Sequence, residues 1–342
     1  MINTLIVDDS PLLRDILRDF LESDGSFNII GEAVDGEDGL QKILTLNPDL
    51  VTMDVEMPKM TGLQVIDEVI KKTFVPIVVF TSLDTAATAY EATMRGALEF
   101  YSKEVLSASL SLAKRQAIFE TLKRISGIKN KNKIQAAEAA APGTAARQLE
   151  AREIHAVVVA SSTGGPKALA KFCSLLPDDF PVPIVIVQHN DPGFDKSFAE
   201  WLDARTNLRV KLAEEGEAPT RGTIYIARTD RHLVVERHDA EYCFNYNDGE
   251  PENNQKPAAD ALFRTAAESM REAVISVVLT GMGSDGARGT QSIRAMGGIT
   301  LAQDEETSLI YGMPKAAAET GCVDMVLPLE RIPEELVRLT KW

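Results

Sequence analysis

The chain has 342 residues, 44% of them hydrophobic, and because this length exceeds the usual size of one domain we expect two domains with separate cores. The net charge of −15 disfavours binding to a nucleic-acid backbone or an anionic membrane surface, because both need clustered lysines and arginines. The three cysteines (Cys173, Cys243 and Cys322) lie outside any Cys-x-x-Cys spacing, which argues against a disulfide framework or a zinc site. With no signal-peptide pattern and no apolar run of membrane-spanning length, we predict a cytoplasmic protein without direct membrane insertion.

Residues 1–124 alternate apolar strands with amphipathic helices, which predicts an α/β domain with a parallel sheet covered on both faces. The strand-like runs are NTLIVD, PDLVTMD, VPIVVFTS and GALEFYSK. In the first expected helix Leu13, Ile16, Leu17 and Phe20 recur at helical spacing, after Ser10 as a possible N-cap. This helix should therefore pack on the sheet.

Residues 125–152 differ in composition from the segments on either side. They are rich in Ala, Lys and Asn and contain few large apolar side chains. So little of this segment could join a core that we predict a linker, in part helical.

In residues 153–342 apolar strand-like runs again alternate with helical segments. The strand-like runs are IHAVVVA, PIVIVQH, AVISVVLT and GITLAQD. Between 222 and 247 three short strand-like runs, GTIYIA, HLVVERH and YCFNYN, follow one another without helices. We therefore predict a doubly wound α/β domain that carries an antiparallel hairpin.

Polar side chains gather at the ends of the expected strands of the first domain. Asp8 and Asp9 follow the first strand, Asp54 ends another, Thr81 ends the next, and Lys103 follows the one after. In a parallel sheet these groups meet at the carboxyl edge, where three carboxylates would bind Mg²⁺ and the hydroxyl and ammonium could hold a phosphoryl group. Each residue taken singly also fits a helix cap, a strand end or a solvated lysine.

The stretches VDDS, TMDVEMPKMTG, VVFTS and EFYSKE resemble response-regulator receiver domains. The resemblance implies a flavodoxin-like fold with a five-stranded parallel sheet. It also implies that Asp54 accepts a phosphoryl group from a histidine kinase, with Mg²⁺ held by Asp8, Asp9 and Asp54.

The same resemblance assigns roles to the later strands of this domain. Thr81 and Lys103 would contact the phosphate, and Phe100 would occupy the position of the family's switch aromatic. Glu104 departs from the family pattern, in which a proline usually follows the lysine.

The stretch VVVASSTGG, residues 157–165, runs an apolar strand into a turn of serines, threonine and glycines. Such a turn before a helix can cradle a phosphate with its backbone N–H groups, or it can present a nucleophile. Neither a Walker motif nor G-x-G-x-x-G is present at this turn, so the phosphate interpretation is weak.

A second glycine-rich stretch, GMGSDG at 281–286, does match G-x-G-x-x-G and follows an apolar strand. Asp304 ends the next strand, near the spacing of a ribose-binding acid. A dinucleotide-binding oxidoreductase is therefore an alternative, although the motif opens the final third of its domain.

Nucleophilic catalysis is the third interpretation, because a serine needs a neighbouring base and that base needs an orienting acid. Of the four histidines, only His189 ends a core-type strand, one βα unit beyond the serines. Asp285 also follows a strand, so Ser161 or Ser162, His189 and Asp285 should share one sheet edge. A helix cap, a hydrogen-bonded strand end and a turn residue would explain the same three positions.

Residues 154 to about 338 resemble the catalytic domain of the chemotaxis protein-glutamate methylesterase family. The matching stretches are ASSTGGPKAL, QHNDPGFDKSFAEWL, GTIYIARTDRHL, KPAADALFRTAA, LTGMGSDGARG and GMPKAAAETGCVDMVLPL. The resemblance implies that Ser162 is the nucleophile, His189 the general base and acid, and Asp285 the acid that orients His189. It also implies that the backbone N–H of Met282 helps to bind the oxyanion.

Together the two resemblances imply phosphorylation-activated hydrolysis of glutamyl methyl esters on chemoreceptors, with deamidation of receptor glutamines as a related reaction. The ester hydrolysis would need no cofactor. Asn190 and Arg228 depart from the family pattern near the expected substrate rim. A phosphorylation-dependent binding module without catalysis is a further alternative.

Overall fold

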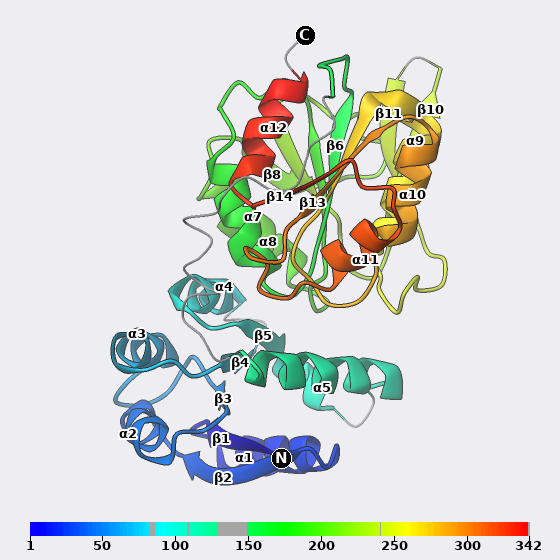
Figure 1. Ribbon diagram of the computed structural model, residues 1–342. Coiled ribbons are helices and arrows are strands. Elements are labelled where there is room, and N and C mark those ends of the chain that lie inside the picture. Colours follow the sequence, from blue (N-terminus) through cyan, green and yellow to red (C-terminus); the bar gives the residue numbers. More distant parts are fainter. Residues whose placement is uncertain (83–85, 108–109, 129–148, 240, 341–342) are drawn as a thin grey trace. The chain divides into compact units, whose positions relative to one another are not determined.

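The computed structural model describes residues 1–82, 86–107, 110–128, 149–239 and 241–340 (Figure 1). The chain divides into two compact units, Met1–Lys131 and Asn132–Trp342. Most of the predicted linker at 125–152 lies outside the described residues. Within the described part of the chain, no helix is long and apolar enough to cross a membrane.

The N-terminal unit is built on five parallel strands in the order β2-β1-β3-β4-β5, which confirms the predicted flavodoxin-like sheet. The strands are β1 (Ile2–Val7), β2 (Phe27–Ala33), β3 (Leu50–Met53), β4 (Ile77–Thr81) and β5 (Glu99–Ser102). The helices are α1 (Pro11–Glu22), α2 (Gly36–Leu46), α3 (Gly62–Lys72), α4 (Ala86–Arg95) and α5 (Leu112–Ser126). The edge strand β2 was not singled out from the sequence, because most of its side chains are only partly buried.

Helix α1 begins as its sequence predicts. The Ser10 hydroxyl accepts a hydrogen bond from the Leu13 N–H at 3.4 Å, and Pro11 occupies the first turn, where its missing N–H costs nothing. Leu17 and Phe20 of its apolar face are buried. This face packs α1 against the sheet and fixes the chain that follows Asp8 and Asp9.

The C-terminal unit contains seven parallel strands in the order β14-β13-β12-β6-β7-β9-β8. The strands are β6 (Ala156–Ser161), β7 (Ile184–Gln188), β8 (Arg209–Leu212), β9 (Thr223–Ile226), β12 (Val274–Val278), β13 (Ile299–Gln303) and β14 (Met325–Leu327). The helices are α7 (Gly165–Ser174), α8 (Asp195–Asp203), α9 (Ala259–Met270), α10 (Ala287–Ala295), α11 (Met313–Glu319) and α12 (Arg331–Thr340). Figure 1 shows α7, α8 and α12 on one side of this sheet and α9 and α10 on the other, which confirms the doubly wound α/β fold.

The predicted antiparallel hairpin consists of β10 (His232–His238) and β11 (Glu241–Asn247), which pair separately from the large sheet. The assignment of GTIYIA to the same antiparallel segment was wrong. That run forms β9, which pairs in parallel with β7 and β8. Sequence could not show this, because a short apolar strand has the same pattern in either direction.

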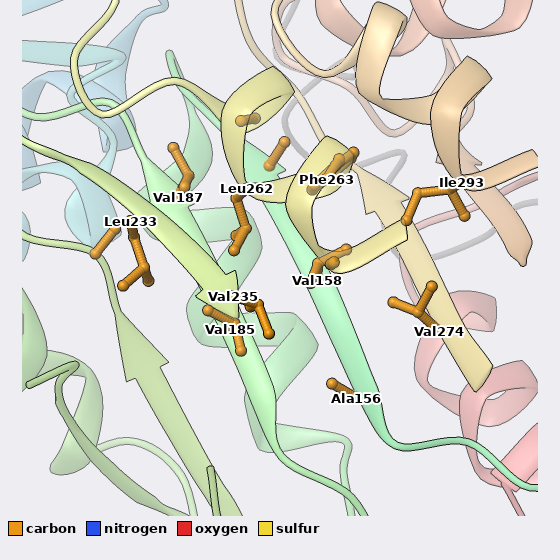
Figure 2. Close-up of a cluster of buried hydrophobic side chains, with 14 of the residues drawn as sticks. Ala156, Val158, Val185, Val187, Leu233, Val235, Leu262, Phe263, Val274 and Ile293 are labelled. Atoms are coloured by element: carbon orange, nitrogen blue, oxygen red, sulfur yellow. The ribbon is translucent and has the colours of Figure 1, made fainter. Parts of the chain in front are cut away.

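One buried cluster joins the sheet, the hairpin and α9 (Figure 2). Val158 of β6 and Val185 of β7 contribute from the sheet, Val235 from the hairpin, and Leu262 and Phe263 from α9. All five side chains are almost completely shielded from solvent. Removal of this apolar surface from water holds α9 and the hairpin against the sheet, and so fixes the position of the N-terminus of α9.

Candidate active site and phosphorylation site

Three neighbouring strands of the C-terminal sheet, β12, β6 and β7, bring the predicted catalytic residues to one edge. Ser162 directly follows β6, His189 directly follows β7, and Asp285 lies in the turn between β12 and α10. The chain leaves β6 toward β7 on one side and later adds β12 on the other, so the strand order reverses beside Ser162. Ligands of open α/β sheets bind at such a reversal.

The turn that carries Ser162 is held by Gln188, the last residue of β7. The Gln188 side chain accepts a hydrogen bond from the Ser161 hydroxyl at 2.7 Å and donates to the Ser162 carbonyl at 3.1 Å. A Cβ at Gly165 would collide with the Gln188 carboxamide oxygen, so only glycine allows this approach. The two serines therefore differ, because Ser161 is buried and engaged while Ser162 is partly exposed.

His189 meets Asp285 through the ring nitrogen Nε2, which lies 2.8 Å from Asp285 Oδ2. An ionised carboxylate can only accept, so in the neutral form of the ring the proton is on Nε2 and Nδ1 carries the lone pair. Nδ1 is buried and makes no hydrogen bond with Ser162 or with any other residue that the structure describes. Since catalytic hydrogen bonds often tighten only when substrate binds, Nδ1 is the nitrogen available as a base for Ser162.

The Asp285 carboxylate is buried, and both of its oxygens accept hydrogen bonds. Besides His189, it accepts from the backbone N–H groups of Ala259 at 2.7 Å and Asp260 at 3.0 Å, which begin helix α9, and from Gly286 at 3.1 Å. Burial alone would raise the pKa of Asp285, but the contact with His189 and the backbone donors outweigh burial and lower it. Asp285 is therefore held as an ionised, fixed acceptor.

Met282, the predicted oxyanion donor, lies in the turn after β12. Gly281, directly before it, abuts the serine so closely that a Cβ there would come within 2.8 Å of the Ser162 Cβ. The Ser162 N–H also donates to the carbonyl of Thr280 at 3.0 Å, which ties the two turns together. Met282 thus follows a glycine that lies against Ser162, and its role as a donor to the oxyanion stays a prediction.

The geometry of GMGSDG disfavours a nucleotide loop. The helix that follows it, α10, has the N–H of Gly289 in its first turn bound by the Asp260 carboxylate at 2.7 Å, where a pyrophosphate would need free donors. Asp304, the candidate ribose acid, accepts from the Thr307 N–H at 2.9 Å and stabilises its own turn.

The other three histidines are occupied elsewhere or lie on the surface. His155 contacts the Tyr242 hydroxyl at 2.8 Å, and His232 is buried between the carbonyl of Glu250 and the N–H of Ala258. His238 is exposed on the outer face of the hairpin, where it forms a loose group with Glu236 and Cys243. An ordinary cross-strand contact between polar surface groups accounts for this cluster.

In the N-terminal unit Asp8, Asp9 and Asp54 come together as predicted, with carboxylate oxygens within 4.8 Å of one another. Lys103 lies 2.6 Å from Asp54 Oδ2 and 3.0 Å from Asp8 Oδ2. Lys103 is thus an ion-pair partner of both carboxylates, and its contact with Asp8 Oδ2 has less favourable hydrogen-bond geometry than its contact with Asp54. The all-oxygen donor set of Asp8, Asp9 and Asp54 fits Mg²⁺.

Burial dominates the electrostatics of Asp54 and raises its pKa, despite the hydrogen bond from Lys103. Burial opposes the charge of Lys103, but its contacts with Asp54 and Asp8 raise the pKa of the ammonium overall. The site therefore holds an electron-rich, poorly solvated carboxylate beside one fixed cation.

Thr81 and Phe100 lie on the neighbouring strands β4 and β5. Thr81 is completely buried at the end of β4, next to β3 and the Asp54 that follows it. The Phe100 ring is buried and packs edge-on against Tyr90 of α4, with ring centroids 4.9 Å apart. Their roles as phosphate contact and switch aromatic stay predictions.

The sequence did not single out the partners that hold the predicted catalytic residues. Gln188 stands in the sequence only as the last residue of an apolar strand, and Asn253, which donates to Asp285 at 3.0 Å, lies in a polar loop. An asparagine in a polar loop carries no signal of its own, and the backbone of Asn253 adopts a positive φ of 52° that asparagine tolerates.

Comparisons with known proteins agree with both halves of the chain. The family model for the CheB methylesterase matches residues 157–336, and that for the response regulator receiver domain matches residues 4–114. A protein-glutamate methylesterase/protein-glutamine glutaminase from Pyrococcus abyssi is 39% identical, over 98% of this chain and 93% of the relative. One from Thermotoga maritima is 37% identical, over 99% and 98%.

A solved structure gives the same answer for the second half. The crystal structure of the Thermotoga maritima CheB methylesterase catalytic domain is 43% identical and aligns with a TM-score of 0.54, over 55% of this chain and 100% of that one. Because near full-length relatives and the family models agree, the chain belongs to the CheB methylesterase family and carries a response regulator receiver domain at its N-terminus.

Proposed function

We propose that the protein hydrolyses glutamyl methyl esters on chemoreceptors with Ser162, His189 and Asp285 as a catalytic triad. The observation that carries the proposal is the contact of His189 Nε2 with the buried Asp285 carboxylate, which leaves Nδ1 as a base at the strand-order reversal beside Ser162.

The chemistry follows from these groups. Ser162 Oγ attacks the ester carbonyl carbon while its proton passes to His189 Nδ1, and the backbone N–H of Met282 donates to the oxyanion. The imidazolium then returns the proton to the departing oxygen, so methanol leaves and Ser162 stays acylated. Water attacks the acyl carbon, Nδ1 takes its proton and returns it to Ser162 Oγ, and a glutamate carboxylate is released.

The same groups support deamidation of receptor glutamines, because His189 can protonate a departing ammonia as it protonates methoxide. The names of the Pyrococcus abyssi and Thermotoga maritima relatives include both activities.

The N-terminal unit is the regulatory input in this proposal. Asp54 is the acceptor for the phosphoryl group of a histidine kinase, and Thr81 and Lys103 contact that group. Asp8, Asp9 and Asp54 would hold Mg²⁺, which when bound supplies positive charge for the phosphoryl oxygens. Phosphorylation then shifts the protein toward a more active state.

Ester cleavage in ¹⁸O-labelled water tests the activity directly. A methylated chemoreceptor fragment is incubated with the protein, digested and analysed by mass spectrometry. We expect loss of the methyl group, ¹⁸O in the glutamyl carboxylate and unlabelled methanol, since water attacks an acyl carbon. Persistence of the methyl ester, or ¹⁸O in the methanol, would contradict the proposal.

A further inference from the structure

We propose that Asn253 is a positioning residue for the reaction, which fixes the Asp285 carboxylate by tying it to the buried carboxylate of Asp260. This inference rests on the proposed function, because it acts through Asp285.

Both amide hydrogens of Asn253 are used within this contact. Nδ2 donates to Asp285 Oδ1 at 3.0 Å and to Asp260 Oδ2 at 2.8 Å, while Oδ1 accepts from Arg288 Nη2 at 3.2 Å. The reverse amide orientation would face its oxygen toward two carboxylates and its nitrogen toward a guanidinium. The neighbours of Asn253 therefore fix which way the amide points.

Asp260 provides a rigid anchor for this bridge. Its side chain is 1% exposed, accepts from Arg288 Nε at 3.0 Å and binds the N–H of Gly289 in the first turn of α10. Asp285, which precedes α10, in turn binds the first N–H groups of α9. Asp285 thus caps the N-terminus of α9, and Asp260 of α9 caps the N-terminus of α10. Asn253 joins the two capping carboxylates.

The bridge matters because His189 depends on the direction of the Asp285 oxygens. Asp285 Oδ2 must face His189 Nε2, and the donors on Oδ1, among them Asn253, resist rotation of the carboxylate about χ2. Without Asn253, the carboxylates of Asp285 and Asp260 lose the donor that they share, and the repulsion between these two negative charges favours rotation of Asp285. His189 would then lose its alignment toward Ser162 without loss of any substrate contact.

The test compares Asn253→Gly with Asn254→Gly in the full-length protein. Both asparagines have a positive φ, 52° and 60°, so glycine is tolerated by the backbone at either position. Asn254 is exposed and forms no hydrogen bond with Asp285 or Asp260 in the described part of the chain, which makes it a matched control. We expect Asn253→Gly to lower kcat for methanol release by about 10- to 100-fold with KM unchanged, and Asn254→Gly to match the wild type.

Two further variants separate positioning from a fold defect. Asn253→Asp keeps the side-chain volume but adds a third carboxylate, and it should slow the reaction at least as much as Asn253→Gly. In an Asp285→Asn background, Asn253→Gly should cause little further loss, because its effect passes through Asp285.

The possible results distinguish a failure of this inference from a failure of the proposed function. Equal activity of Asn253→Gly and Asn254→Gly would overturn the inference, as would an undiminished loss in the Asp285→Asn background. If Asp285→Asn alone released methanol at the wild-type rate, the proposed triad itself would fail instead.

Discussion

Two carboxylates, Asp54 and Asp285, lie at corresponding places in the two units, each at the carboxyl edge of a parallel sheet, and their surroundings differ in one respect. Asp285 accepts hydrogen bonds from backbone donors, Asn253 and His189, and its pKa is lowered. Asp54 has the Lys103 ammonium at 2.6 Å and one long contact of 3.5 Å from the Glu56 N–H, and its pKa is raised.

The number of hydrogen-bond donors around an aspartate therefore decides which chemical role the residue suits. A carboxylate with every lone pair engaged is a fixed orienting group, because rotating or protonating it breaks several hydrogen bonds at once. A carboxylate that is buried with few donors keeps reactive lone pairs and leaves room for a cation. Asp285 is suited to hold His189, and Asp54 is suited to accept a phosphoryl group.

The largest effect should come from the nucleophile. Ser162→Ala removes the attacking oxygen, and we expect methanol release to fall by about a million-fold, the loss typical of a triad serine. Ser161→Ala is the matched control, since it removes only the hydrogen bond to Gln188 and should cost at most about 10-fold. Comparable rates for the two variants in a methanol-release assay would show that Ser162 has no special role.

Asp285→Asn should come next. Its amide can no longer act as a pure acceptor for His189 Nε2–H, so the ring tends toward the tautomer that protonates Nδ1, and kcat should fall by about 10⁴-fold. Steady-state kinetics measure this. An unchanged kcat would mean that His189 needs no orienting acid.

Removal of Mg²⁺ should affect the reaction at Asp54 and leave the reaction at Ser162 unchanged. Chelation with EDTA should abolish stimulation of the esterase by a small phosphodonor, because the phosphoryl oxygens would then lack the positive charge that Mg²⁺ held by Asp8, Asp9 and Asp54 would supply. The unstimulated esterase rate should stay the same, because the proposed chemistry of Ser162, His189 and Asp285 needs no metal ion. A loss of the unstimulated rate that Mg²⁺ restores would contradict this division.

The smallest effect concerns stability in acid. The folded-state pKa of Asp285 is lowered, so its ionised form stabilises the C-terminal unit fully above the unfolded value of about 3.9, and this contribution is lost as pH falls through the lower folded value. At pH 7 Asp285→Asn should lower the free energy of unfolding by about 2 kcal/mol. The difference in the free energy of unfolding between Asp285→Asn and the wild type should become smaller below about pH 4.

Urea unfolding followed by tryptophan fluorescence measures this difference, since Trp201 is buried in α8 of the C-terminal unit and the sequence of the N-terminal unit contains no tryptophan. A difference that stayed constant with pH would show that the charge of Asp285 does not contribute.

The sequence predicted which residues come together at each sheet edge, because strand ends of a parallel sheet share an edge. Asp8, Asp54 and Lys103 converge in the N-terminal unit, and His189 and Asp285 meet in the C-terminal one, although they are far apart in the chain. Alternation of apolar strands with polar termini is a local pattern, so it can be seen without the fold.

The supporting contacts could not be predicted in this way. The bridge from Asn253 to Asp285 and Asp260 depends on where α9, α10 and one loop meet, and the use of Nε2 by His189 depends on the ring orientation. Likewise the parallel pairing of β9 depends on its neighbours in the sheet, which no pattern within the strand specifies.

The most direct test of the account is methanol release from methylated chemoreceptors by the full-length protein, with and without a small phosphodonor and Mg²⁺. We expect the wild type to release methanol and to accelerate with the phosphodonor, Asp54→Asn to show no acceleration, and Ser162→Ala to be slower than the wild type by about a million-fold in both conditions. Release by Ser162→Ala at the wild-type rate, or equal acceleration of Asp54→Asn and the wild type, would contradict the account.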